Sequence, residues 1–259
     1  MSYKLTKFGG VNLPQYNRES GLDTAPPNDG FVAAILGGYD SYGINEAPSR
    51  PPYMLTVRGI ISEETDAGQR AAIDGLRALA RTRGQLIRQA DDDASEHWAT
   101  ARLQAIAHRR ITGVNGYQVL EFSWLVESEW YGEELSDSVS LGSSPFTLSV
   151  ENPGNRAITD AVLTITAGDD PITAVSITAT NGTHLVWAGT LASGDALVFD
   201  CGVKSVTNDG ANAYSGFSYG ENHSIDDWLR IVGAMDITIN YTGSSVDATV
   251  GIEYYEGWK

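Results

Sequence analysis

Short apolar runs recur at near-regular spacing from Phe146 onward, and this pattern constrains the fold more than any other feature of the sequence. Residues typical of turns separate the runs, among them Asn152-Pro153-Gly154-Asn155 and the hairpin signal Asn181-Gly182. Strands that recur every 8–12 residues or so with turns between them are typical of an antiparallel β-sandwich. We therefore predict strands at Phe146–Val150, Ala161–Thr166, Ile172–Thr178, His184–Ala188, Ala196–Cys201, Asp236–Tyr241 and Val246–Tyr254.

One helix is expected in the first half of the chain, over residues 62–83. Ser62 is a suitable N-cap, because its hydroxyl can accept a hydrogen bond from an N–H group of the first turn. Ala72, Leu76 and Leu79 recur at i, i+4 and i+7, which predicts one apolar stripe that packs on a sheet. Gly84 is suited to the left-handed residue that closes a helix.

The segments around this helix indicate strands. Apolar or alternating runs predict strands at Phe31–Leu36, Tyr53–Val57, Gly59–Ile61, Gln85–Gln89 and Tyr117–Val126, and the run Trp98–Ile106 fits either a strand or a short helix.

The charge distribution changes near residue 135. The chain has 259 residues and a net charge of −16. Residues 1–135 hold 13 Lys and Arg against 18 Asp and Glu, whereas residues 136–259 hold 4 against 15. With an acidic, small-residue linker at 133–144, this change predicts two domains, 1–135 and 146–259, and places their boundary at 133–145. The expected fold class is mainly β: an α+β N-terminal domain with one principal helix, and a C-terminal antiparallel sandwich.

Composition narrows the functional classes. Nucleic-acid binding needs basic surfaces that displace counterions, and neither half is basic overall. No apolar run approaches the roughly 20 residues that span a bilayer, and the first residues lack a secretory signal, so we expect synthesis in a cytoplasm and no membrane partner. The single cysteine, Cys201, is expected to be a small buried hydrophobic residue.

A serine hydrolase is one hypothesis that the sequence raises. Gly216-Phe217-Ser218-Tyr219-Gly220 has the letters of a nucleophile elbow, and His223 is close. That chemistry needs a strand–turn–helix context, whereas this segment belongs to a region of strands and loops. We therefore interpret it as a glycine-rich surface loop and predict no catalytic residue.

Metal and cofactor sites are not expected either. Asp91, Asp92, Asp93, Glu96 and His97 are close in sequence, but consecutive carboxylates point in different directions and the spacing of a calcium loop is absent. We interpret them as a solvated turn. The histidines lack the spacing of zinc ligands, and no glycine-rich phosphate loop is present, so we predict no metal and no cofactor.

Carbohydrate binding remains open through two tryptophans. Trp187 and Trp228 could stack on a sugar, since aromatic rings offer flat apolar faces. Trp187 lies in Leu185-Val186-Trp187, where packing is the preferred interpretation, and Trp228 follows Asp226-Asp227, which suggests a surface turn.

The order of these pieces resembles the distal tail protein family of long-tailed, non-contractile bacteriophages. Three stretches carry the resemblance: Pro51-Pro52-Tyr53 through the helix to Gly84-Gln85-Leu86; Trp98-Ala99-Thr100-Ala101-Arg102-Leu103 through Trp124 and Trp130-Tyr131; and Asn152-Pro153-Gly154-Asn155, with Gly194-Asp195 to Asp200 and Gly202-Val203-Lys204-Ser205-Val206-Thr207.

The resemblance implies a structural protein of the virion, not an enzyme. It implies a hexameric ring formed by the N-terminal domain between the tail tube protein and the tail-tip hub or receptor-binding components. The C-terminal domain would project outward as a galectin-like sandwich. Such a ring, assembled in the host cytoplasm, would let DNA through its channel without specific binding, and Asp91–Asp93, Glu63 and Glu64 are candidates for the channel or its rim. The alternative is a carbohydrate-binding module fused to an adaptor domain.

Overall fold

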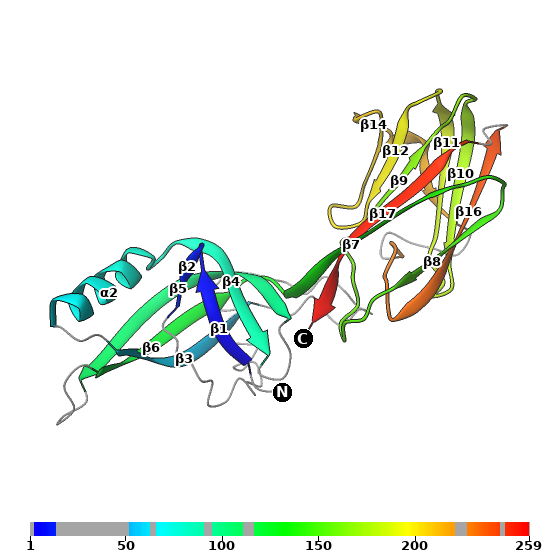
Figure 1. The fold of residues 1–259 in the computed structure, drawn as a ribbon. Coiled ribbons are helices and arrows are strands. Elements are labelled where there is room, and N and C mark those ends of the chain that lie inside the picture. Colours follow the sequence, from blue (N-terminus) through cyan, green and yellow to red (C-terminus); the bar gives the residue numbers. More distant parts are fainter. Residues whose placement is uncertain are drawn as a thin grey trace. The chain divides into compact units, whose positions relative to one another are not determined.

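A computed structural model describes residues 3–13, 52–62, 66–90, 95–110, 117–220, 227–243 and 247–258. The chain divides into two compact units, Met1–Gly132 (unit 1) and Glu133–Lys259 (unit 2). Both are built mainly from antiparallel strands (Figure 1). Within the described ranges, no helix is long and apolar enough to cross a membrane.

Unit 1 is a curved antiparallel sheet with the strand order β2-β1-β4-β5-β6-β3 (Figure 1). The buried residues of β6 alternate along the strand, as Leu120, Phe122, Trp124 and Val126 do, which is the pattern of a strand with one face on the core. The elements are β1 (Tyr3–Phe8), β2 (Val11–Asn12), β3 (Tyr53–Ser62), α2 (Asp66–Ala78), β4 (Arg83–Ala90), β5 (Glu96–Arg110) and β6 (Tyr117–Val126).

Aromatic rings fill the core of unit 1. The Trp124 ring meets the Phe8 ring edge-on, with centroids 4.5 Å apart. Trp130 is buried, its indole N–H donates to the Tyr53 hydroxyl at 2.7 Å, and the Arg88 guanidinium lies 4.2 Å above its ring. These contacts satisfy the one polar atom of Trp130 and fix the start of β7 (Trp130–Ser140) against the sheet.

The helix is shorter than the sequence predicts. It covers Asp66–Ala78, so Ser62 ends strand β3 and does not cap the helix. After Ala78 the chain leaves the helical path, and Arg81 takes the left-handed conformation with φ 69° while its N–H donates to the carbonyl of Leu103. The expected closing residue, Gly84, lies in β4, where an added Cβ would approach Gly9 Cα to 3.3 Å. The predicted stripe is confirmed at Leu76, which is buried.

Unit 2 is a sandwich of two antiparallel sheets. One has the order β15-β11-β10-β16-β8, and the other runs β14-β13-β12-β9-β17-β7. The elements that follow β7 are β8 (Phe146–Glu151), β9 (Val162–Thr166), β10 (Ile172–Ala179), β11 (His184–Leu191), β12 (Ala196–Asp200), β13 (Ser205–Asn208), β14 (Ala211–Asn212), η1 (Tyr214–Gly216), β15 (Phe217–Tyr219), β16 (Ala234–Gly243) and β17 (Thr249–Trp258).

The seven strands predicted after Phe146 all form in unit 2, with ends that shift by a few residues. Gly182 has φ 95° in the turn between β10 and β11, a conformation that glycine adopts without strain, so the Asn-Gly hairpin is confirmed. Alternate side chains of these strands fill one core between the two sheets, including Val250, Ile252 and Tyr254 from β17 and Ala248 just before it.

Three further predictions concern the linker, the ambiguous run and the first predicted strand. The stretch 133–144 is not a linker, because β7 continues through Ser140 and pairs with β17. Backbone pairing at the sheet edge creates this strand with few apolar side chains, so hydrophobic periodicity could not reveal it. The ambiguous run Trp98–Ile106 is a strand, part of β5. The predicted strand Phe31–Leu36 lies outside the described residues.

Candidate interaction surfaces

Ser218 lies in an edge strand. It is exposed in β15, opposite Val186 of β11, and the one-turn helix η1 precedes this strand. A nucleophile elbow places its serine between a strand and a following helix, and that context is absent around the described residues of this segment. His223 lies outside the described residues.

The acidic residues considered as metal ligands are only partly described. Asp91–Asp93 lie outside the described residues, as do Glu63 and Glu64. Glu96 is exposed and pairs with Lys7 at 3.4 Å, whereas the adjacent His97 is buried. Within the described ranges, no group of three or more His, Cys, Asp or Glu side chains could hold a metal ion.

Neither tryptophan considered for sugar binding is on the surface. Trp187 and Trp228 are 3% and 4% exposed, so the stacking hypothesis is wrong for both. Trp228 is not in a surface turn, because its ring stacks on Phe217 with centroids 5.2 Å apart and its N–H donates to the Tyr219 hydroxyl at 3.1 Å. The neighbouring Leu229 and Ile231 are also buried, which explains why this irregular segment enters the core despite its polar start.

Cys201 is buried beneath the turn after β12, as expected. Burial is the main cause that raises the pKa of its thiol to about 12, and the charges of Asp200 and Asp160 add to this effect. A thiol with that pKa is protonated at neutral pH and is therefore a poor nucleophile.

The Asn152–Asn155 motif is hydrogen-bonded to the end of strand β17. The Asn152 side-chain amide donates to the carbonyl of Arg156, and its carbonyl oxygen accepts from the N–H groups of Gly154 at 3.0 Å and Gly257 at 3.3 Å. An added Cβ on Gly154 would lie 1.9 Å from the Gly257 carbonyl oxygen, so the two backbones touch. The motif that contributes to the family resemblance is thus structural in this chain.

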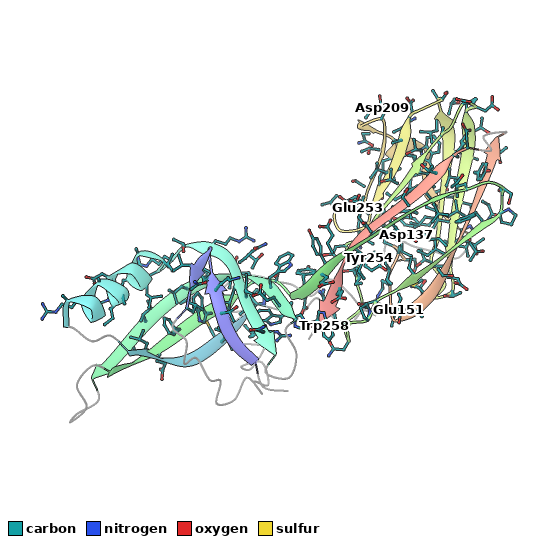
Figure 2. The ribbon with its side chains drawn as sticks, in the orientation of Figure 1. Asp137, Glu151, Asp209, Glu253, Tyr254 and Trp258 are labelled. Atoms are coloured by element: carbon teal, nitrogen blue, oxygen red, sulfur yellow. The ribbon has the colours of Figure 1, made fainter. Side chains whose placement is uncertain are left out.

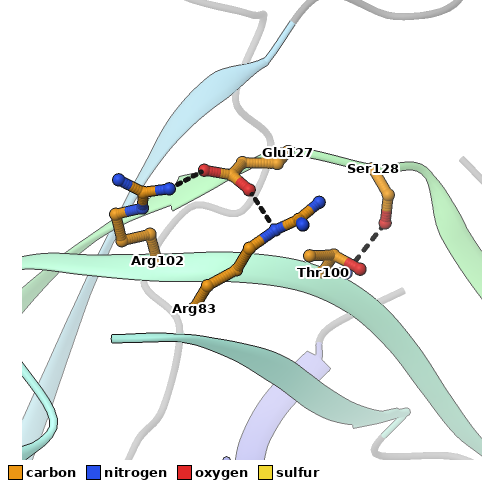
Figure 3. A network of polar contacts seen from close by, with 5 residues as sticks. All are labelled: Arg83, Thr100, Arg102, Glu127 and Ser128. Atoms are coloured by element: carbon orange, nitrogen blue, oxygen red, sulfur yellow. Dashed lines mark hydrogen bonds and ion pairs between the residues drawn. The ribbon is translucent and has the colours of Figure 1, made fainter. Parts of the chain in front are cut away.

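A basic patch lies where β4 and β5 meet the connection between β6 and β7, and we define it as Arg81, Arg83 and Arg102. Arg83 and Arg102 are opposite each other in the β4–β5 register. Both bind Glu127, Arg83 Nε at 2.8 Å and Arg102 Nη2 at 3.3 Å (Figure 3). Arg81 is exposed, and its backbone bond to Leu103 keeps it beside Arg102. Two guanidiniums therefore share a single carboxylate, and the third arginine of the patch, Arg81, is exposed beside them.

The connection that carries Glu127 is itself held in place. The Ser128 hydroxyl accepts a hydrogen bond from the Thr100 N–H at 2.8 Å (Figure 3). The same hydroxyl donates to the Glu129 carbonyl. The backbone N–H of Glu127 also donates to the Thr100 carbonyl at 2.7 Å. The carboxylate between the two arginines is thus fixed by the fold, and the patch is a preorganised surface.

An acidic ribbon lies on β7 and β17 of unit 2, and we define it as Glu133, Glu134, Asp137, Glu253 and Glu256. Figure 2 labels Asp137 on the green strand β7 and Glu253 on the red strand β17. Glu134 accepts a hydrogen bond from the Tyr255 hydroxyl at 3.3 Å. Burial, followed by the charge of Glu134, raises the pKa of Tyr255, and Glu253 adds to this shift. None of the ion pairs found between described residues includes a member of the ribbon.

Comparison with solved structures identifies the fold. The crystal structure of the SPP1 Dit (gp 19.1) protein aligns with 97% of this chain and 98% of its own, with a TM-score of 0.60 and 14% sequence identity. The chain has the fold of SPP1 Dit. SPP1 Dit is described as a paradigm of the hub adsorption apparatus in phages that infect Gram-positive bacteria. Because the alignment covers nearly the whole of both chains, the Dit fold includes both units.

Two structures of the phage p2 baseplate in its activated conformation, with Sr and with Ca, align less well. Each match covers 79% of this chain at 12% identity, and the TM-scores are 0.34 and 0.33. These scores are too low to support an argument about the Dit fold of this chain. No protein-family model and no curated protein sequence matches the chain.

Sequence reasoning missed both charged surfaces. The three arginines of the basic patch come from a turn and two strands, and they meet only because β4 and β5 pair in this register. The acidic ribbon was hidden because β7 had been interpreted as a linker. The charge imbalance after residue 135 was the one available signal, and it gives the sign of the ribbon but not its position.

Proposed function

We propose that this chain is a structural subunit of a bacteriophage tail tip, the distal tail ring that connects the tail tube to the adsorption apparatus. The observation that supports the proposal is the likeness to SPP1 Dit over 97% of the chain.

In this proposal the two domains have separate roles. Residues 1–135 form the ring, six copies to a ring, and residues 146–259 project from it as a galectin-like domain. The partners are other copies of the chain, the tail tube protein, and the hub or receptor-binding components of the tip. The protein is assembled in the host cytoplasm and resides in the virion.

A carbohydrate-binding module was the alternative from the sequence. It depended on Trp187 and Trp228, and both rings are buried and packed against other side chains. No observation now favours that function, so we do not propose it.

The negative net charge is consistent with a channel through which DNA passes without binding. Six copies at −16 each carry a formal charge of −96, and a surface of this sign repels phosphate groups. We expect DNA to pass without specific binding.

Electron microscopy of the purified full chain tests this function. Class averages should show a six-fold ring with a central channel, and duplex DNA added at physiological salt should not bind to it. Isolated particles without a ring at every protein concentration would contradict the proposed assembly, and tight DNA binding would contradict the role of the channel.

A further inference from the structure

The high negative charge creates a difficulty for any assembly of this chain with itself. Copies at −16 each repel one another, so their contact is favoured only where the facing surfaces depart from the mean charge. The basic patch is such a surface. It carries three arginines against one glutamate in a chain where acidic residues outnumber basic ones by 33 to 17.

The fold of a single copy does not explain the patch. Like charges opposite each other in adjacent strands are destabilising, and Arg83 is directly opposite Arg102. Glu127 offsets part of this repulsion, but its side chain is only 18% exposed, while the side chains of Arg83 and Arg102 are 65% and 44% exposed. Exposed ion pairs contribute little to stability, so the arrangement has little value to the isolated subunit.

The acidic ribbon is the complementary surface. Glu134 and Glu253 are exposed and flank Tyr255, and the ion pairs of the described residues leave both without a cation. They lie on two strands of the sandwich, β7 and β17, so their spacing is fixed by the sheet. Guanidinium groups bind carboxylates through paired, directed hydrogen bonds. Two ordered carboxylates match the two arginine charges that Glu127 leaves unbalanced.

We propose that the basic patch of one copy docks on the Glu134–Glu253 face of the acidic ribbon of a second copy. This inference rests on the proposed function, which supplies the homo-oligomer. It adds a contact between unit 1 of one copy and unit 2 of its neighbour to the contacts among the ring-forming residues 1–135, and this contact lowers the repulsion between copies of a highly acidic chain. Complementary charge also selects the orientation of the neighbour, because a patch placed against another patch, or a ribbon against another ribbon, is repelled.

Charge reversal with matched controls tests the contact in the full-length protein. Arg83→Glu alters the patch, and Arg70→Glu makes the same change of net charge on the exposed face of α2. Glu253→Lys alters the ribbon, and Asp209→Lys is its control in an exposed turn (Figure 2). Sedimentation velocity over a concentration series gives the dissociation constant of the oligomer, and thermal melting shows that each variant is folded.

We expect Arg83→Glu and Glu253→Lys each to weaken association about tenfold relative to their controls, because each reversal replaces attraction by repulsion at several neighbouring charges. The variant that carries both reversals should return to within about threefold of the wild-type constant, since the two faces are again complementary.

Three results would overturn the inference. Patch and control variants that associate equally would show that only net charge matters. If the variant with both reversals associates more weakly than either single variant, the two surfaces do not meet. A wild-type protein that stays monomeric would contradict the proposed function and this contact together, whereas the first two results leave the proposed function in place.

Discussion

At the scale of single residues, Gly154 of the Asn152–Asn155 motif leaves no space for a larger side chain. Its Cα faces the Gly257 carbonyl so closely that a methyl group does not fit. We predict that Gly154→Ala lowers the unfolding free energy of unit 2 by about 1–3 kcal/mol, the usual cost of forcing an extra carbon into a packed site. Urea unfolding measures this change. Ser193→Ala, in an exposed turn of the same unit, is the control and should stay within about 0.5 kcal/mol of wild type.

The Cys201 thiol gives a prediction about pH. Its folded pKa of about 12 lies above the ordinary value of 9.0, so the folded state holds the proton more tightly than the unfolded chain. The stabilising effect is complete below pH 9.0 and is lost progressively as the pH rises toward 12. Wild type should therefore lose unfolding free energy above pH 9 more steeply than Cys201→Ala. Equal slopes for the two proteins would show that the thiol is not the group responsible.

At the scale of elements, Leu76 tests how α2 packs. The side chain is 5% exposed, so Leu76→Asp would bury an unpaired charge and cost several kcal/mol, on the order of other buried-charge substitutions. We expect a large drop in the melting temperature of unit 1. Ala71→Asp, on the exposed face of the same helix, should change it little. An unaltered melting temperature for Leu76→Asp would mean that this face of α2 is not packed.

The elements also show where sequence reasoning succeeds. Strands of unit 2 bury alternate side chains, so the alternation of apolar residues in the sequence was enough to predict strands such as Ile172–Ala179 and Thr249–Trp258. Strand β7 could not be predicted from hydrophobic periodicity, because pairing with β17 creates it and six of its residues after Gly132 are exposed polar or acidic side chains. The end of α2 was misplaced since a tertiary hydrogen bond, from Arg81 to Leu103, turns the chain before the apolar stripe ends. Long-range contacts therefore decided the elements that local sequence missed.

Long-range contacts also decide how far the candidate surfaces could be predicted from the sequence. Buried Cys201 and the packed Trp187 could be predicted from their apolar neighbours, whereas the position of Trp228 depends on its packing against Phe217. The basic patch depends on strand register, which one sequence does not define.

At the scale of the whole molecule, we propose that the two units are separate domains and that the second one begins at Glu133. Leu141 is buried in the core of unit 2, and Leu135 and Val139 of β7 pack against it. A fragment that begins at Glu133 should therefore fold when expressed alone. A fragment that begins at Phe146 lacks these side chains and the edge strand, and we expect it to melt at a lower temperature. Equal melting temperatures would show that β7 adds nothing to the second domain, and two unfolded fragments would contradict the division.

The oligomeric state of the full chain tests the central claim most directly. Native mass spectrometry of the purified protein should give one dominant species of six subunits, which at 27.8 kDa each is about 167 kDa. The hexamer should remain the dominant species when the protein is diluted. A monomer of 27.8 kDa at every concentration would contradict the account, because a chain that does not assemble cannot form a tail ring.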